Sequence, residues 1–190
     1  MSIILASASP RRKELLEMLG VRELRIVPAV GEEKAAPGLP PSELVKALAA
    51  HKAKEVSAIA SPDDVVLAAD TIVWADGAVF GKPRSETHAA EMLRTLSGQQ
   101  HEVYTGVAVI RGGVTLLDYE RSAVRFRALS DREIAAYIAT GEPMDKAGAY
   151  GIQGRASLFV EGIEGDFFNV MGLPLCRLGI MLRELGVELL

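Results

Sequence analysis

The hydrophobic pattern of the first twenty residues predicts a strand, a turn and a helix. Residues 3–5 are continuously apolar, as in a buried strand, and small residues follow them. Ser9 and Pro10 are typical of an N-cap and a first helical residue. The predicted helix opens with three cations at 11–13, where the helix dipole is positive and each costs roughly 0.3–1 kcal/mol. A bound anion explains this placement, so the turn is a candidate phosphate site; a surface helix with solvated cations is the alternative.

Apolar periodicity and turn residues predict alternating strands and helices along the rest of the chain. The expected elements are a strand at 24–27, a helix at 43–60 capped by Ser42, a buried strand running from 65 to 74, a return strand at 79–83, a helix at 85–96, a pair of strands at 102–111 and 115–127, a helix capped by Ser130 with Glu133 and ending near Gly141, a strand at 158–160, and a closing helix after Pro174.

One acid, Asp70, falls inside the apolar strand that begins at residue 65. A carboxylate at such a position is expensive unless it is paired, hydrogen-bonded or bound to metal. Ligands of open α/β sheets gather at the carboxyl ends of strands. Asp70 is therefore the best single candidate for chemistry, and a structural acid or cap is the alternative.

The dipeptide Asp76-Gly77 predicts a hairpin whose return strand leads to Lys82. A two-residue turn would set Lys82 opposite Thr71, on the other face from Asp70. A three-residue turn would set it on the same face as Asp70. The sequence leaves this choice open, and Gly81 with Pro83 favours a bulge or an early end of pairing.

Within residues 141–154, Gly148, Gly151 and Gly154 recur every three residues, which suits neither a core helix nor a plain strand. Such a segment is typical of backbone that approaches a ligand closely, and the amide of Gln153 can donate and accept in one plane. A mobile glycine-rich connector is the alternative. The pair Glu32-Glu33 is equally open, either as a solvated loop edge or as part of a metal or active site.

Composition narrows the class of protein. The chain has 190 residues, 49% of them hydrophobic and 24% charged, which suits one ordinary globular domain. The net charge of −4 argues against a nucleic-acid-binding module. The one cysteine, Cys176, allows no intrachain disulfide and is expected in the core. We find no signal peptide and no membrane-spanning stretch, so we expect a cytoplasmic protein without membrane partners.

Taken together, local cations with carboxylates describe a polyphosphate substrate that carries a divalent metal. The sequence has no Ser-His-Asp order, no P-loop and no dinucleotide glycine fingerprint. Hydrolysis with Mg²⁺ or Mn²⁺ is the chemistry that this inventory favours.

Five motifs, in order, resemble those of the Maf family of septum-formation-inhibitor-like nucleotide pyrophosphatases. They are Ser-Ala-Ser-Pro-Arg-Arg at 7–12, Ala-Asp-Thr at 69–71, Gly-Lys-Pro at 81–83, Asp-Lys-Ala-Gly-Ala-Tyr-Gly-Ile-Gln-Gly at 145–154 and Asn-Val-Met-Gly-Leu-Pro at 169–174. The resemblance implies a single domain, 1–190, with a mixed α/β fold: an elongated twisted β-sheet flanked by helices, in two lobes with a central cleft, like inosine triphosphate pyrophosphatases. It also implies cleavage of a nucleoside triphosphate between the α- and β-phosphates with Mg²⁺ or Mn²⁺.

The same resemblance implies roles for individual residues. Asp70 matches the proton acceptor and a metal position, and Glu33 matches a second metal position. The run Gly31-Glu32-Glu33 departs from the usual apolar-Asp-Glu pattern, so either glutamate could serve. Positions tied to substrate choice in the dTTP/UTP branch are matched by Arg12, Thr71 and Gln153, and phosphate-binding positions by Ser7, Arg11, Arg12, Lys52 and Lys82.

Two alternatives remain. A 7-methyl-GTP-type pyrophosphatase of the same family would keep the chemistry and change the base. A non-catalytic, nucleotide-binding regulator of septum formation would need no chemistry at all. Beyond the nucleoside triphosphate we expect no stable nucleic-acid partner, and a homodimer is left open.

Overall fold

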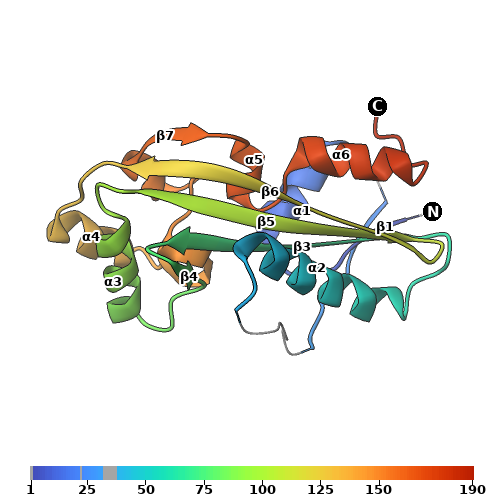
Figure 1. Ribbon diagram of the computed structural model, residues 1–190, viewed down its shortest axis with the longest axis horizontal. Coiled ribbons are helices and arrows are strands. Elements are labelled where there is room, and N and C mark those ends of the chain that lie inside the picture. The colour runs from blue at the N-terminus through green and yellow to red at the C-terminus, as the bar shows by residue number, and fades with distance from the viewer. Residues whose placement is uncertain (1, 22, 32–37) are drawn as a thin grey trace. The chain divides into compact units, whose positions relative to one another are not determined.

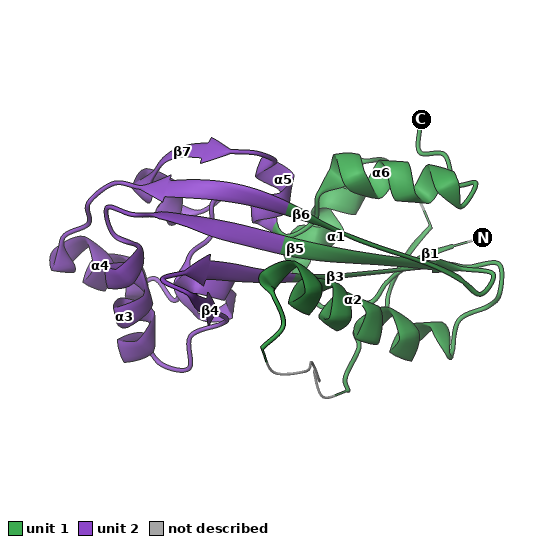
Figure 2. Ribbon diagram, in the orientation of Figure 1, with its two compact units in different colours: residues 1–70, 105–120, 172–190 green, residues 71–104, 121–171 purple. Residues whose placement is uncertain are grey.

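The computed structural model describes residues 2–21, 23–31 and 38–190 (Figure 1). The two glutamates of the 32–33 pair, including the expected metal ligand Glu33, lie outside the described residues. The chain divides into two compact units (Figure 2). Unit 1 holds residues 1–70, 105–120 and 172–190, and unit 2 holds residues 71–104 and 121–171.

Seven strands of the described chain form one mixed sheet in the order β2-β1-β3-β5-β6-β7, with β4 paired to β3. Their bounds are β1 Ile3–Leu5, β2 Leu24–Ile26, β3 Val65–Ala75, β4 Ala78–Phe80, β5 Gln100–Arg111, β6 Val114–Phe126 and β7 Val160–Glu164. Strand β1 runs parallel to β2 and β3, whereas β4 and β7 pair antiparallel with β3 and β6. The expected mixed α/β class is confirmed.

In unit 1, helices α1 (Pro10–Met18), α2 (Pro41–Ser57) and α6 (Leu175–Glu184) pack on the strands. Figure 1 shows α2 on one side of β1 and β3, with α1 and α6 on the other. One buried cluster joins α2 to both strands; it comprises Ile4, Ala6, Ala49, Ala53, Val56, Val66, Ala68, Ala108 and Ile110.

Close packing of α2 depends on Gly106 in β5. A Cβ atom there would collide with the main chain of Val45 and Lys46 in α2. The glycine therefore brings the helix nearer to the sheet than any other residue would allow.

Helix starts in unit 1 test two of the sequence predictions. Helix α1 begins at Pro10 with Ser9 as its N-cap, as predicted. The predicted Ser42 cap is wrong, because α2 begins two residues earlier than predicted, at Pro41, and its N-cap is Pro40. A proline at the first helical position has its φ already set for a helix and has no N–H of its own to satisfy, and no side chain caps this start.

The expected burial of Cys176 is also wrong, since its side chain is exposed. The buried face of α6 is formed by Leu175, Leu178, Met181 and Leu182. Residue 176 turns away from that face by helical geometry, although the apolar residues Leu175 and Leu178 lie near it in sequence.

Unit 2 holds helices α3 (Glu86–Leu96), α4 (Asp131–Ile138) and α5 (Phe167–Met171). The predicted capping box of Ser130 with Glu133 is present at the start of α4. Residues 142–159 form three short 3₁₀ turns at Glu142–Asp145, Ala147–Ala149 and Arg155–Phe159. Because the third turn occupies the region where a strand at 158–160 was predicted, β7 begins only at Val160.

The β3–β4 hairpin has the two-residue turn Asp76-Gly77, and both residues have positive φ, 50° and 74°. Ala75 pairs with Ala78, so the turn is symmetric. Pairing ends at Phe80, which confirms the early end that Gly81 and Pro83 favour. Lys82 therefore lies beyond the ladder, and the hairpin register does not fix its face.

Among the described residues, every helix is too short or too polar to cross a bilayer.

Candidate functional site

Asp70 lies within β3, and only 8% of its surface is exposed. Lys52, from the C-terminal half of α2, places its Nζ 2.5 Å from the Asp70 Oδ1. Strand alternation sets Asp70 on the same face as Val66 and Ala68, the face that packs against α2. The acid that interrupts the apolar run is thus neutralised by a neighbouring cation, which offsets much of the cost of burying it.

The turn between β1 and α1 is held by its own side chains. Ser9 N donates to the Ser7 Oγ at 3.2 Å, and the Arg12 guanidinium donates to the same oxygen at 3.1 Å. The Arg12 Nε also donates to the carbonyl oxygen of Gly172 at 2.8 Å. The predicted cationic turn is therefore a built structure in which Arg12 is fixed from two sides, whereas Arg11 is half-buried beside it.

Strand register brings this turn alongside the acid. Leu5 of β1 pairs with Leu67 of β3, and Ala6 N still donates to the Leu67 carbonyl at 2.7 Å. The turn that starts at Ser7 therefore leaves β1 beside the stretch of β3 that leads from Leu67 to Asp70. Ser7, Arg12, Lys52 and Asp70 thus belong to adjoining parts of unit 1.

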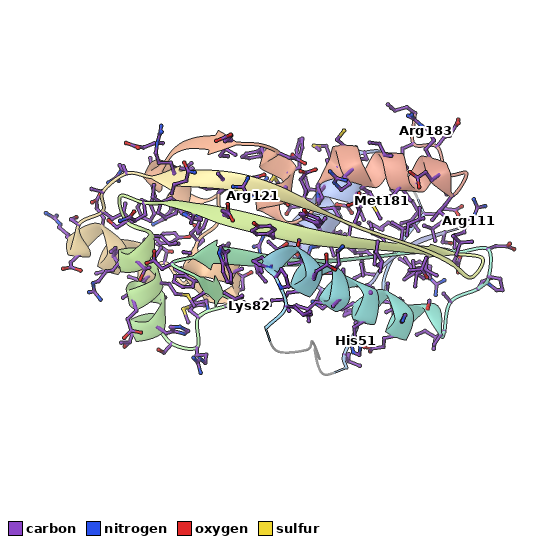
Figure 3. All side chains as sticks on the ribbon, in the orientation of Figure 1. His51, Lys82, Arg111, Arg121, Met181 and Arg183 are labelled. Carbon is purple, nitrogen blue, oxygen red and sulfur yellow. The ribbon has the colours of Figure 1, made fainter. Side chains whose placement is uncertain are left out.

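The remaining described candidates lie in unit 2. Thr71 follows Asp70 in β3 and is half-buried, while Lys82 (labelled in Figure 3) and Gln153 have exposed side chains. The main chain next to Lys82 is anchored, because Gly148 N donates to the Gly81 carbonyl at 3.1 Å. Lys82 and Gln153 therefore project from segments that are held by their backbone.

The glycines of residues 148–154 pack against side chains of the protein itself. Cβ atoms added to them would lie 2.7 Å from the Val73 Cγ2 at Gly148 and 2.5 Å from the Lys146 Cε at Gly151, and would overlap the Glu142 carboxylate at Gly154. Gly148 also has a φ of +69°. Close packing against these side chains of unit 2 therefore accounts for a glycine at each of the three positions.

Sequence reasoning missed three groups in this region: the Gly172 carbonyl, the Tyr137 hydroxyl and the Glu142 carboxylate. Tyr137 donates to Glu142 Oε1 at 3.0 Å, and burial raises the pKa of Tyr137 above its ordinary value. Gly172 belongs to the 169–174 motif, so its place in that motif was a usable signal. Nothing in the sequence pattern marked Tyr137 or Glu142.

Among the described residues, Asp70 is the candidate ligand for a divalent metal. Within the described residues there is no group of three or more His, Cys, Asp or Glu side chains able to hold an ion by themselves. Asp70 supplies one carboxylate near the cationic turn, and Mg²⁺ is commonly held by one or two carboxylates together with substrate phosphates. The donor chemistry therefore fits Mg²⁺ or Mn²⁺.

The fold has a solved relative. A HAM1 protein from Coxiella burnetii superposes with a TM-score of 0.53 over 97% of this chain and 99% of its own, at 15% sequence identity. The likeness defines the class of fold, a HAM1-like mixed α/β fold, in agreement with the expectation of an inosine triphosphate pyrophosphatase-like architecture.

The sequence comparisons define the family. Residues 2–185 match the family described as Maf-like protein. The chain is 52% identical over 188 residues to the dTTP/UTP pyrophosphatase of Moorella thermoacetica, covering 98% of this chain and 96% of that protein. It is 50% identical over 186 residues to the dTTP/UTP pyrophosphatase of Bacillus cereus strain ATCC 10987, covering 98% and 91%. The chain belongs to the Maf family.

Proposed function

We propose that this chain hydrolyses dTTP and UTP to the nucleoside monophosphate and pyrophosphate. The observation that carries the proposal is the buried Asp70, paired with Lys52 at 2.5 Å and set beside the cationic turn by the β1–β3 register. The relatives that share about half of its residues are named dTTP/UTP pyrophosphatases, which supports the same substrates here. The family match includes residues of both units, which supports treating residues 1–190 as one domain.

In the proposed reaction, Asp70 accepts a proton from the attacking water. The water oxygen bonds to the α-phosphorus, and the bond from that phosphorus to the bridging oxygen of the β-phosphate breaks. Pyrophosphate leaves with the electron pair. The Lys52 ammonium holds the Asp70 carboxylate in place through this step, because it is the charge that the buried acid contacts.

We assign the triphosphate to the cations and to the Ser7 hydroxyl. The guanidinium of Arg12 is already oriented by Ser7 and Gly172, so little side-chain freedom is lost when it binds a phosphate oxygen. Arg11 and Lys82 would add further positive charge for the phosphates. Preorganised donors of this kind stabilise charge that develops on the leaving pyrophosphate.

A bound Mg²⁺ or Mn²⁺ would be held by Asp70 and the substrate phosphates, with Glu33 as a further ligand, and would neutralise phosphate charge there.

Base selection is assigned to Arg12, Thr71 and Gln153. Thymine and uracil both present a ring N–H between two carbonyl groups. The amide of Gln153 can meet this edge with one acceptor and one donor.

The test is a profile of product release from dTTP, UTP, dCTP, GTP and 7-methyl-GTP with Mg²⁺ or Mn²⁺. We expect pyrophosphate from dTTP and UTP at the highest kcat/KM. Release of orthophosphate alone contradicts the proposal, and preference for 7-methyl-GTP assigns the chain to the other branch of the family. Nucleotide binding without turnover identifies a regulator.

A further inference from the structure

The turn that carries the exposed side chain of Gln153 is bonded to a buried hydroxyl at its first residue. Gly151 N donates to the Tyr137 Oη at 3.2 Å, and the turn closes through Gly154 N, which donates to the Gly151 carbonyl at 3.0 Å. Tyr137 is 4% exposed and stacks edge-on against Phe159 at 5.1 Å between ring centroids. The first end of the turn is therefore fixed to the core of unit 2.

The other end is bonded to a carboxylate. Arg155 N donates to the Glu142 Oε2 at 3.1 Å, while the Glu142 Oε1 accepts from the Tyr137 hydroxyl at 3.0 Å. Gly154 packs so closely on this carboxylate that a Cβ atom would overlap it. One Tyr–Glu pair thus holds the main chain on both sides of Gln153.

The pair is itself held in place. Glu142 N donates to the Thr140 Oγ1 at 3.1 Å, and the Lys146 Nζ donates to the Glu142 carbonyl at 2.6 Å. Burial raises the pKa of Tyr137, so its hydroxyl keeps the proton that it donates to Glu142. A partly buried network in which these bonds are all formed favours one arrangement, and the main chain that it contacts takes its position from that arrangement.

We infer that Glu142 and Tyr137 are positioning residues that set the place of the Gln153 amide, and through it the choice of base. The inference rests on the proposed function, because it deepens the assignment of Gln153 to base selection. Neither residue needs to touch the nucleotide, since both act through the backbone of the 151–155 turn.

The experiment measures the ratio of kcat/KM for dTTP to kcat/KM for dCTP. The two nucleotides differ in the polar edge of the base and in the 5-methyl group of thymine. We expect Glu142→Ala and Tyr137→Phe each to lower this ratio about tenfold, the effect of roughly one lost hydrogen bond. Glu142→Gln keeps a carbonyl oxygen for one of the two donors, so it should restore most of the ratio.

A double variant separates positioning from general damage. If Glu142 acts through Gln153, then Glu142→Ala leaves the ratio unchanged in a Gln153→Ala background. The matched control is Glu161→Ala, which removes an exposed carboxylate of unit 2 that pairs with Arg125 at 3.2 Å. It should leave the ratio at the wild-type value.

Two results overturn the inference while hydrolysis of dTTP stands: an unchanged ratio in Gln153→Ala, or an unchanged ratio in both Glu142→Ala and Tyr137→Phe, including the case in which both nucleotides lose kcat/KM equally. If Glu142→Ala does not fold, Tyr137→Phe alone decides, because it keeps the ring that packs on Phe159. Failure of the wild-type chain to release pyrophosphate from dTTP overturns the proposed function instead, and the inference falls with it.

Discussion

The two units hold their candidate residues in different ways. In unit 1 the side chains themselves are fixed, Asp70 by the Lys52 ammonium and Arg12 by an oxygen on each side. In unit 2 the candidates Lys82 and Gln153 are exposed, and the backbone that carries them is fixed, as around Gln153. The contrast matches two tasks: proton transfer and phosphate binding need charges at set positions, whereas recognition of a base needs a shaped loop.

The largest expected effect is on the acid of unit 1. Asp70→Asn keeps the size of the side chain and removes its capacity to accept a proton, so kcat for pyrophosphate release from dTTP should fall about 1000-fold. Asp64→Asn is the matched control, because Asp64 is a second buried acid of unit 1 and accepts from Ser2 N at 3.0 Å. Equal losses of kcat in both variants would remove Asp70 from the reaction.

The second largest effect is expected from replacing Lys52, the cation that pairs with Asp70. Lys52→Met leaves a nearly buried carboxylate without its counter-charge, and we expect the free energy of unfolding to fall by about 3 kcal/mol. Urea unfolding followed by circular dichroism measures the change. The control Arg25→Met breaks the pair with Asp64, in which the Arg25 side chain is 55% exposed, and should cost well under 1 kcal/mol. If the two variants lose similar stability, the Lys52–Asp70 pair is no more important for stability than the Arg25–Asp64 pair.

Lowering the pH should reduce the stability of the folded state through a histidine in the aromatic core of unit 2. Burial lowers the pKa of His101 from 6.5 to about 4, and its ring contacts Phe126 and Tyr150. Above pH 6.5 the imidazole is neutral in both states; below it the unfolded chain takes up a proton that the folded chain does not. The stabilising contribution is therefore complete above pH 6.5 and is lost progressively as the pH falls toward 4.

Between pH 7 and pH 5 the loss should be roughly 2 kcal/mol. Urea unfolding at the two pH values measures it, and the His101→Phe variant should show a difference smaller by that amount. The same pH dependence in this variant would assign the acid sensitivity to other groups.

The smallest effect concerns the fixed arginine. Arg12→Lys keeps the positive charge but cannot reproduce the two-sided hold by Ser7 and Gly172, so KM for dTTP should rise about tenfold. Steady-state kinetics at saturating metal measure this change. Arg25→Lys is the control on an exposed arginine of the same unit, and a rise in KM there as well would show that the orientation of Arg12 is unimportant.

Features set by neighbouring residues were predictable from the sequence. The Ser9 cap, the capping box at Ser130 and the Asp76-Gly77 turn each depend on a few adjacent positions, and all three are present. The strand that carries Asp70 was recognised because its apolar run is continuous.

Features that depend on tertiary packing were not. Nothing local pairs Lys52 with Asp70, because that contact needs α2 docked on β3. The burial of Cys176 was misjudged for a related reason: apolar neighbours in sequence do not say which face of α6 meets the core. The Tyr137–Glu142 pair lies at an irregular segment, where bonds from side chains to main chain leave no periodic pattern.

The absence of a side chain at Gly106 also affects the position of residues further along α2. Gly106 sets how closely α2 approaches the sheet at Val45. Lys52 lies seven residues later in the same helix, about 10 Å along its axis. The absence of a side chain at Gly106 in β5 therefore helps to set where α2 places the Lys52 ammonium beside Asp70 in the neighbouring strand β3.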